Sequence, residues 1–224
     1  MVNLEVWKEL TDQFTSAGVS LIAVSKTKPA SDIQELYDAG QRDFGENYVQ
    51  ELVEKQAALP GDINWHFIGH LQSNKVKYIA SFVHLIHAVD NAKLLQEINK
   101  QAAKNDRVID VLLQFYIAKE ESKFGMDEAE INELVANKGL LPHVRICGLM
   151  GMATNTDDMQ QVRKEFAGLH SYFNTLKENY FPSDPAFSKC SMGMSGDYEI
   201  AIEEGSNMVR IGSLLFGSRN YGKQ

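Results

Sequence analysis

Eight short apolar runs, rich in β-branched and aromatic residues, recur along the chain between longer stretches of helical periodicity. This alternation favours parallel strands joined by right-handed crossovers, and eight is the number of strands that closes a barrel. We therefore predict an α/β fold, a single (β/α)8 barrel of the TIM type, with an open doubly wound sheet as the alternative. The expected strands are residues 21–25, 43–45, 65–69, 85–89, 111–116, 146–150, 187–192 and 208–216.

The stretches between these runs carry helix signals. Ser31 and Gln34 have the spacing of a capping box, and Gly40 ends the stripe that follows. The longest stripe covers 159–176 and stops before Pro182. The other expected helices have apolar stripes at Val49, Leu52 and Val53; at Val76, Ile79 and Val83; at Leu94, Leu95 and Ile98; at Ile131, Leu134 and Val135; and at Tyr198, Ala201 and Ile202.

Composition limits the class of protein. No linker divides the 224 residues, so we expect one domain over 1–224. A net charge of −8 opposes binding to nucleic acid, and no apolar run is long enough for a membrane span. The first twenty residues do not resemble a signal peptide, and Cys147 and Cys190 lie in no disulfide or metal pattern. We expect a cytoplasmic monomer with reduced thiols.

Lys26 ends the first predicted strand. Ile22, Val24 and Lys26 share one side of that strand by period-two alternation. If this side is the barrel interior, the Lys26 amine is partly desolvated, which lowers its pKa and makes it a candidate Schiff-base nucleophile. The alternative is a strand-end lysine that extends into water. Lys28 has the same parity, but it precedes Pro29, where the strand has ended.

The last two predicted strands are followed by candidate phosphate loops, as in many barrels of this type. The segment Ser191-Met-Gly-Met-Ser-Gly-Asp follows the seventh strand, and Arg210-Ile-Gly212-Ser213 lies in the eighth. Together they could bind a phosphate through backbone N–H groups, hydroxyls and a cation. Taken singly, the glycines could instead only relieve crowding at barrel corners. The six histidines are scattered and form no metal-ligand pattern, so we expect no metal site.

The chain resembles the pyridoxal phosphate homeostasis proteins, also called the proline synthase co-transcribed protein family. The resemblance rests on several long motifs that occur in the same order: AVSKTKP (23–29), GQRDFGENYVQE (40–51), WHFIGHLQSNK (65–75), KFGM (123–126), GLMGM (148–152), SMGMSGDYEIAIEEGS (191–206) and VRIGSLLFG (209–217). It implies a barrel similar to the N-terminal domain of alanine racemase, which holds pyridoxal 5′-phosphate as a Schiff base.

The resemblance also implies roles for individual residues. It assigns the imine to Lys26 and the phosphate to Ser191, Gly212 and Ser213. Arg210 would face the pyridine nitrogen, and Asn47 and His66 would lie near the ring. A histidine that ends a strand is, however, more often a structural hydrogen-bonding residue.

Arg210 favours a cofactor carrier over an enzyme. A guanidinium beside the pyridine nitrogen opposes its protonation and so weakens the electron sink on which pyridoxal catalysis depends. We expect a protein that buffers the cofactor or delivers it to pyridoxal-phosphate-dependent apoenzymes. The alternatives are a small amino-acid racemase with the same cofactor and a cofactor-free lysine aldolase that binds a phosphorylated sugar.

Overall fold

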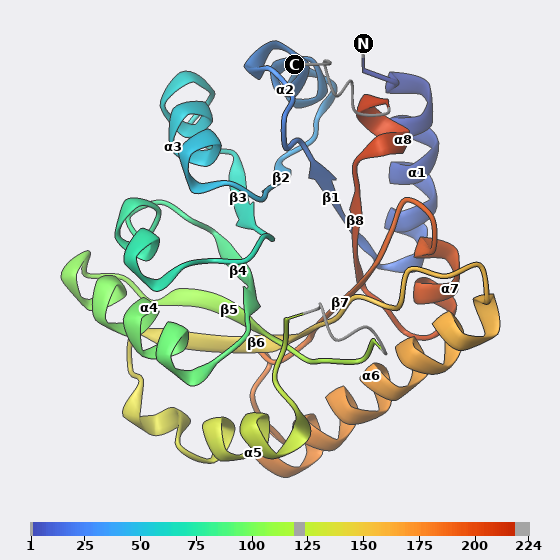
Figure 1. Ribbon diagram of the computed structural model, residues 1–224. Helices are drawn as coiled ribbons and strands as arrows, with labels where there is room; N and C mark the ends of the chain where they lie inside the picture. The colour runs from blue at the N-terminus through green and yellow to red at the C-terminus, as the bar shows by residue number, and fades with distance from the viewer. Residues whose placement is uncertain (1, 119–123, 218–224) are drawn as a thin grey trace.

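The computed structural model describes residues 2–118 and 124–217. Within these ranges eight parallel strands close into a barrel in sequence order, and helices form the ring around it (Figure 1). The predicted barrel is therefore confirmed and the open sheet is excluded. The strands are β1 (Ser20–Val24), β2 (Asp43–Glu46), β3 (Asn64–Phe67), β4 (Leu85–Val89), β5 (Ile109–Gln114), β6 (Val144–Met150), β7 (Lys189–Met194) and β8 (Met208–Ile211).

The helical elements mostly follow the predicted stripes. They are α1 (Leu4–Ala17), α2 (Ala30–Ala39), α3 (Val49–Ala58), the 3-10 helix η1 (Ser73–Tyr78), α4 (Ala92–Lys104), α5 (Glu128–Ala136), the 3-10 helix η2 (Lys138–Leu140), α6 (Met159–Tyr180), α7 (Tyr198–Glu203) and α8 (Ser213–Phe216). The prediction of one domain includes residues 1, 119–123 and 218–224, which lie outside the described part of the chain, as does Lys123 of the KFGM motif.

Three local predictions are wrong. The eighth strand ends at Ile211, and the apolar residues that follow form α8, because a short apolar run does not distinguish strand from helix. Helix α2 begins at Ala30 with Pro29 as its N-cap, so Ser31 lies inside it and forms no capping box. The third stripe begins in the 3-10 helix η1, and its last two residues, Ile79 and Val83, follow outside any helix.

Two apolar layers stabilise the barrel. The larger layer lies between the strands and the surrounding helices. The smaller layer fills the interior, where Ile22, Leu85, Leu112 and Met150 pack together from four different strands. Ile22 thus faces inward, as the alternation along β1 predicted, and this parity directs the end of the same strand toward the barrel mouth.

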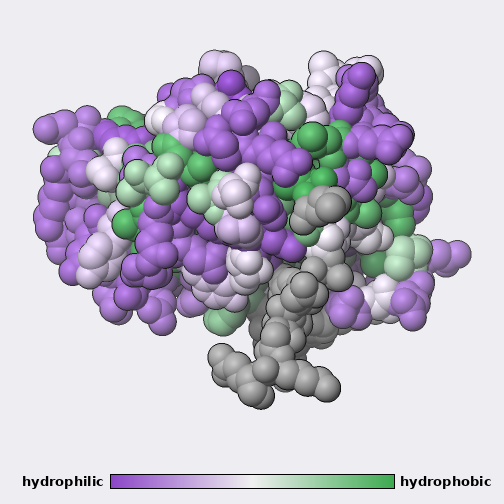
Figure 2. All heavy atoms as spheres, turned by 90° about the horizontal axis from the view of Figure 1, so that it is seen from above, coloured by the Kyte–Doolittle hydropathy of each residue, from purple (hydrophilic) through white to green (hydrophobic). Residues whose placement is uncertain are grey.

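Apolar and thiol groups are largely buried. Cys147 and Cys190 are free, and burial raises the pKa of these thiols to about 11 and about 12 respectively. The outer face seen in Figure 2 is mostly hydrophilic, with apolar residues in small groups. Among the described residues, none of the helices combines the length and the apolar character that crossing a bilayer requires.

Candidate functional site

A cavity of about 300 Å³ opens at the carboxyl ends of the strands. It lies where barrels of this type place their sites, and its volume is at the lower end of the range for small-molecule pockets. Size alone does not identify it, because hollows of about 420 and 510 Å³ lie among the outer helices. The cavity is lined by Val24, Lys26, Lys28, Asn47, Ile68, Met152, Met194, Ser195, Gly196, Arg210, Gly212, Ser213 and Gly217.

The chemistry of this lining distinguishes the cavity. Among the described residues of the lining, Lys26, Lys28 and Arg210 are the cations, and none is a carboxylate, histidine, tyrosine or cysteine. Val24, Ile68 and two methionines give apolar walls. A small cavity of this kind suits a flat, partly apolar molecule that carries negative charge.

A buried ionic network holds the turn that carries Lys26. The Lys55 ammonium, from α3, donates to the Ser25 carbonyl oxygen at 2.9 Å and to the Glu46 carboxylate at 2.7 Å. The Ser25 hydroxyl donates to the same carboxylate at 2.6 Å. The side chain of Glu51 accepts from the Lys55 ammonium at 3.0 Å and from the backbone N–H of residue 27 at 2.8 Å. The residues on both sides of Lys26 are thereby fixed.

Two further features show how tightly this turn is determined. Burial raises the pKa of the Glu46 carboxyl, and the charge and hydrogen bond of Lys55 oppose that rise. Thr27 adopts a φ of 62°, a conformation that costs a β-branched residue energy and persists only where the surroundings impose it. The turn is therefore held in one conformation by contacts behind it, and its lysine is presented to the cavity.

Arg210 reaches the cavity from β8 and is 4% exposed. One terminal nitrogen of its guanidinium donates to the Ser191 carbonyl and hydroxyl oxygens at 2.9 and 2.7 Å, and the other donates to the Gly151 carbonyl at 3.1 Å. Burial lowers the pKa of Arg210 to about 10, so the group remains charged at neutral pH. The guanidinium is a fixed cation at the inner end of the cavity.

Asn47 offers an acceptor without a partner. Its side-chain Oδ1 is buried and accepts no hydrogen bond, although the residue lines the cavity. A buried amide oxygen without a donor costs free energy unless a ligand supplies one. The neighbouring backbone is also constrained, since a Cβ at Gly69 would lie 2.4 Å from the Asn47 carbonyl oxygen.

Gly212, Ser213 and Ser195 meet at the last two strand ends. The Gly212 N–H donates to the Ser195 hydroxyl at 3.2 Å, which joins the loop after β7 to the start of α8. A Cβ at Gly212 would lie 3.3 Å from both Cβ and the carbonyl oxygen of Val24, so the position tolerates little bulk. The first turn of a helix also leaves backbone N–H groups without intrahelical partners.

Two predicted site residues do not line this cavity. Ser191 is fully buried on β7, below Arg210, and its hydroxyl oxygen accepts a hydrogen bond from the Arg210 guanidinium. Ser195, four residues later, is the serine of this segment that lines the cavity. His66 is 1% exposed and contacts Asp43 and His87. The structure thus brings Lys26, Asn47, Arg210, Gly212 and Ser213 together and leaves Ser191 and His66 beneath them.

Ser191 and His66 instead belong to a hydrogen-bonded chain through the barrel. It runs from Arg210 to Ser191 at 2.7 Å, to His87 at 3.2 Å, to His66 at 2.9 Å and to Asp43 at 2.9 Å. An arginine only donates and a carboxylate only accepts, so the donors run from Arg210 toward Asp43. Ser191 then donates to Nδ1 of His87, and each histidine carries its proton on Nε2 and donates it to the next group.

Electrostatics agree with neutral imidazole in the middle of this chain. Burial is the main cause that holds the pKa of His87 well below its usual value, and the charge of Arg210 acts in the same direction. Burial is the largest single influence on the Asp43 carboxyl and would raise its pKa, but the hydrogen bonds from His66 and Asn64 and the neighbouring histidines together outweigh it, so the pKa is lowered overall. This chain of hydrogen bonds therefore joins the Arg210 cation at the cavity to the Asp43 carboxylate at the opposite end of the barrel.

Comparison with known proteins defines the class of the chain. The family described as "Alanine racemase, N-terminal domain" matches residues 4–220. The crystal structure of alanine racemase from Bartonella henselae, with covalently bound pyridoxal phosphate, superposes with a TM-score of 0.72 at 16% identity, covering 100% of this chain and 61% of that one. At that identity the likeness shows the fold alone: a barrel of the alanine racemase class.

Closer relatives narrow the class to one family. The chain is 44% identical over 202 residues to the pyridoxal phosphate homeostasis protein of Aquifex aeolicus, covering 90% of this chain and 87% of the relative. It is 41% identical over 211 residues to the Escherichia coli protein of the same name, covering 92% of this chain and 88% of the relative. The structure of PipY from Synechococcus elongatus with pyridoxal phosphate bound superposes with a TM-score of 0.85 at 36% identity, covering 95% of this chain and 99% of that one. The chain belongs to the pyridoxal phosphate homeostasis protein family, which confirms the resemblance of its motifs.

Proposed function

We propose that this chain binds pyridoxal 5′-phosphate in the cavity at the barrel mouth, holds it as an imine on Lys26, and buffers or delivers it without catalysing with it. The lining of the cavity carries the proposal: its described residues include a lysine on a fixed turn and two further cations, and none of them is a carboxylate. The names of the relatives and the cofactor bound to PipY support it.

The residues present fit this cofactor. The positive charge of the lining favours a ligand whose phosphate carries nearly two negative charges near neutral pH, and the apolar walls match an aromatic ring. The unpartnered Asn47 oxygen could accept a hydrogen bond from a ring substituent. The lack of a side chain at Gly212 leaves room for an anion beside the hydroxyls of Ser195 and Ser213.

We assign the roles accordingly. When bound, the cofactor supplies an aldehyde that condenses reversibly with an amine and a ring that can accept electrons. Lys26 provides the amine, and Ser195, Gly212 and Ser213 hold the phosphate, so Ser195 replaces the predicted Ser191 in this role. The Arg210 guanidinium opposes protonation of the ring nitrogen.

The lining also favours a carrier over a racemase. Racemisation requires an acid or base on each face of the substrate, with a pKa near the working pH. Apart from Lys26, the other lysine in the described lining is Lys28, whose ammonium donates to the Phe216 carbonyl oxygen at 2.7 Å. Neither the lining residues nor the described contacts supply a second base. A cofactor-free aldolase is disfavoured by the relatives' names.

The experiment that tests this function is a transfer assay. Cofactor-loaded protein should restore activity to an added pyridoxal-phosphate-dependent apoenzyme, while itself turning over none of a broad panel of amino acids. Size-exclusion chromatography should give a monomer, and we propose that the protein acts in the cytoplasm. Measurable racemisation of alanine or serine at a rate typical of enzymes would establish the racemase instead.

The phosphate assignment predicts a selective effect of Ser195→Ala. Because a hydrogen bond to a charged group contributes about 1.5–3 kcal/mol, this variant should bind pyridoxal phosphate at least about tenfold more weakly. Its binding of unphosphorylated pyridoxal should change little. Fluorescence titration with both ligands measures the ratio of the two affinities.

Ser191→Ala is the matched control for this measurement. The Ser191 hydroxyl contacts Arg210 and His87 beneath the cavity, so its loss should affect both ligands alike and leave the ratio unchanged. If Ser191→Ala selectively weakens the phosphate ester and Ser195→Ala does not, Ser191 holds the phosphate after all.

A further inference from the structure

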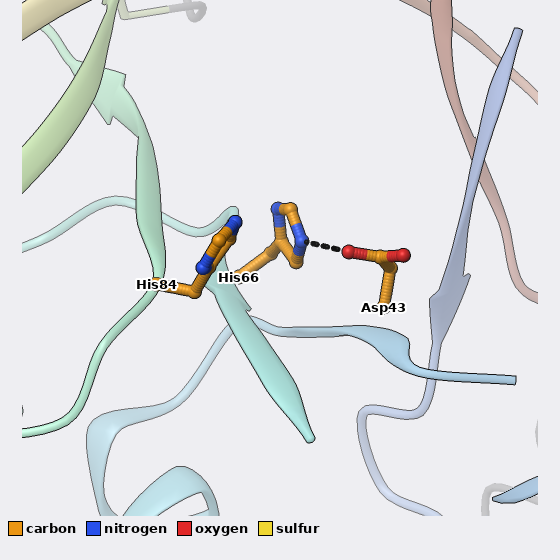
Figure 3. A group of neighbouring side chains, drawn as sticks. All are labelled: Asp43, His66 and His84. Carbon is orange, nitrogen blue, oxygen red and sulfur yellow. Dashed lines mark hydrogen bonds and ion pairs between the residues drawn. The ribbon is translucent and has the colours of Figure 1, made fainter. Parts of the chain in front are cut away.

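Three potential metal ligands gather at the end of the barrel opposite the cavity. Asp43 begins β2, His66 lies on β3 and His84 immediately precedes β4. One carboxylate oxygen and one ring nitrogen from each histidine all lie within 4.8 Å of one another. Figure 3 shows the His66 ring between the Asp43 carboxylate and the His84 ring. This grouping corrects the expectation, from their scatter in the sequence, that the histidines form no metal-ligand cluster.

We propose that Asp43, His66 and His84 bind one divalent transition-metal ion of the zinc class. Two imidazoles and a carboxylate form a donor set that zinc commonly takes, with water in the fourth position. Calcium and magnesium prefer oxygen donors alone, so they fit this set poorly. The site is separate from the cofactor cavity, and the proposal does not depend on the function proposed above.

The geometry requires only a small adjustment. Metal–ligand distances of about 2.0–2.2 Å in a tetrahedral site place donor atoms about 3.3 Å apart. The Asp43 and His66 donors are already 2.9 Å apart, on neighbouring strands of the barrel wall. His84 is exposed, so its ring can rotate toward the other two without disturbing the core. Two ligands are thus preorganised, and the third is free to adjust.

A supporting partner for the metal-bound histidine is already in place. A histidine that ligates a metal usually donates its other ring N–H to a neighbouring acceptor, which fixes its orientation. In this barrel His66 Nδ1 lies 2.9 Å from Nε2 of the fully buried His87. Binding a metal through His66 Nε2 would move the His66 proton to Nδ1, where it is donated to His87.

This rearrangement conserves protons. The His87 proton moves in turn from Nε2 to Nδ1, which lies 3.2 Å from the Ser191 hydroxyl. Each histidine keeps one proton, the His66–His87 and His87–Ser191 hydrogen bonds reverse direction, and metal ligation replaces the hydrogen bond between His66 and Asp43. The Ser191 hydroxyl then accepts from both His87 and Arg210, and Arg210 lines the cofactor cavity.

His84 distinguishes a metal site from a simple structural pair. The hydrogen bond between Asp43 and His66 could by itself orient His66 and His87 without any ion. That explanation gives no role to His84. A metal site needs it, and its exposure means that its removal should leave the fold intact.

The test uses the full chain, freed of any polyhistidine tag and treated with a chelator. Zinc chloride is titrated by isothermal calorimetry into wild type, His84→Ala and Asp43→Asn. Wild type should bind one zinc ion per chain, and each variant should bind it at least about tenfold more weakly. Cobalt(II) in place of zinc should give the visible absorption of tetrahedral coordination in wild type and not in His84→Ala.

His70→Ala is the matched control, because His70 forms a similar pair with Asp90 at 2.8 Å without belonging to the proposed site. It should bind zinc as wild type does. Stoichiometric binding that His84→Ala retains, binding lost in His70→Ala, or no saturable binding by wild type at micromolar zinc would each overturn the proposal. Thermal melting confirms that the variants are folded.

Discussion

Replacing Lys26 with alanine should abolish the visible absorption of the cofactor imine and leave no cofactor covalently trapped after borohydride reduction. Lys26 and Lys28 are the two lysines in the described lining, and the Lys28 ammonium is held by the Phe216 carbonyl oxygen. Lys55 is close to Lys26 in space, but its ammonium lies behind the turn, within the ionic network. Within the described part of the chain, no equivalent amine is therefore positioned to replace Lys26.

The matched variant for this prediction is Lys28→Ala. It should still form the imine, although the loss of a cation from the lining can weaken binding of the phosphate. Lys26→Ala should retain only noncovalent binding, at least about tenfold weaker, which corresponds to about 1.4 kcal/mol. Full imine absorption in Lys26→Ala, with none in Lys28→Ala, would transfer the role to Lys28.

Replacing Arg210 with glutamate should make the bound cofactor chemically active. The buried guanidinium remains charged at neutral pH, because its pKa is lowered only to about 10, and it disfavours a proton on the ring nitrogen. A carboxylate at the same position favours that proton and so strengthens the electron sink. We expect the cofactor-saturated variant to exchange the α-proton of added amino acids with deuterated solvent faster than wild type, as measured by NMR per bound cofactor.

Arg210→Gln separates the two parts of this effect. It removes the cation without adding an anion, so its exchange rate should lie between those of wild type and Arg210→Glu. Both variants lose the donors to the Ser191 and Gly151 carbonyl oxygens, and each acceptor left unsatisfied costs about 1–3 kcal/mol. Melting curves must therefore show folded protein first. If cofactor-loaded Arg210→Glu exchanges the α-proton no faster than wild type, Arg210 is not the reason that the bound cofactor is catalytically inactive.

The sequence predicted those features that depend on regular alternation. Ile22 packs inside the barrel and Val24 lines its mouth, because period-two alternation holds along β1. Lys26 follows in the turn after the strand and also lines the mouth. The helix end at Gly40 was predictable for a local reason, since this glycine adopts a positive φ as the C-cap of α2.

The sequence leaves the lining of the cavity undetermined where the backbone is irregular. Along β7 the pairing with β8 shifts between Ser191 and Met194, and Gly193 adopts a φ of 94°. Parity counted from the start of the strand no longer indicates which serine reaches the cavity. The sequence segment contains both Ser191 and Ser195, and only the fold shows that Ser195 lines the site.

The ionic network and the proposed metal site were missed for a different reason. Glu46, Lys55 and Ser25 come together from β2, α3 and the turn after β1, and no local motif joins them. Asp43, His66 and His84 are far apart in sequence but lie at or near three successive strands. Successive strands are neighbours in a barrel, so the predicted fold already implies that side chains at the starts of these strands lie close together.

A crystal structure of the chain grown with pyridoxal phosphate tests the central claim most directly. We expect continuous density between the cofactor and Nζ of Lys26, a phosphate beside Ser195, Gly212 and Ser213, and the ring nitrogen facing Arg210. Density joined to another lysine, or cofactor bound outside the cavity at the strand ends, would contradict it.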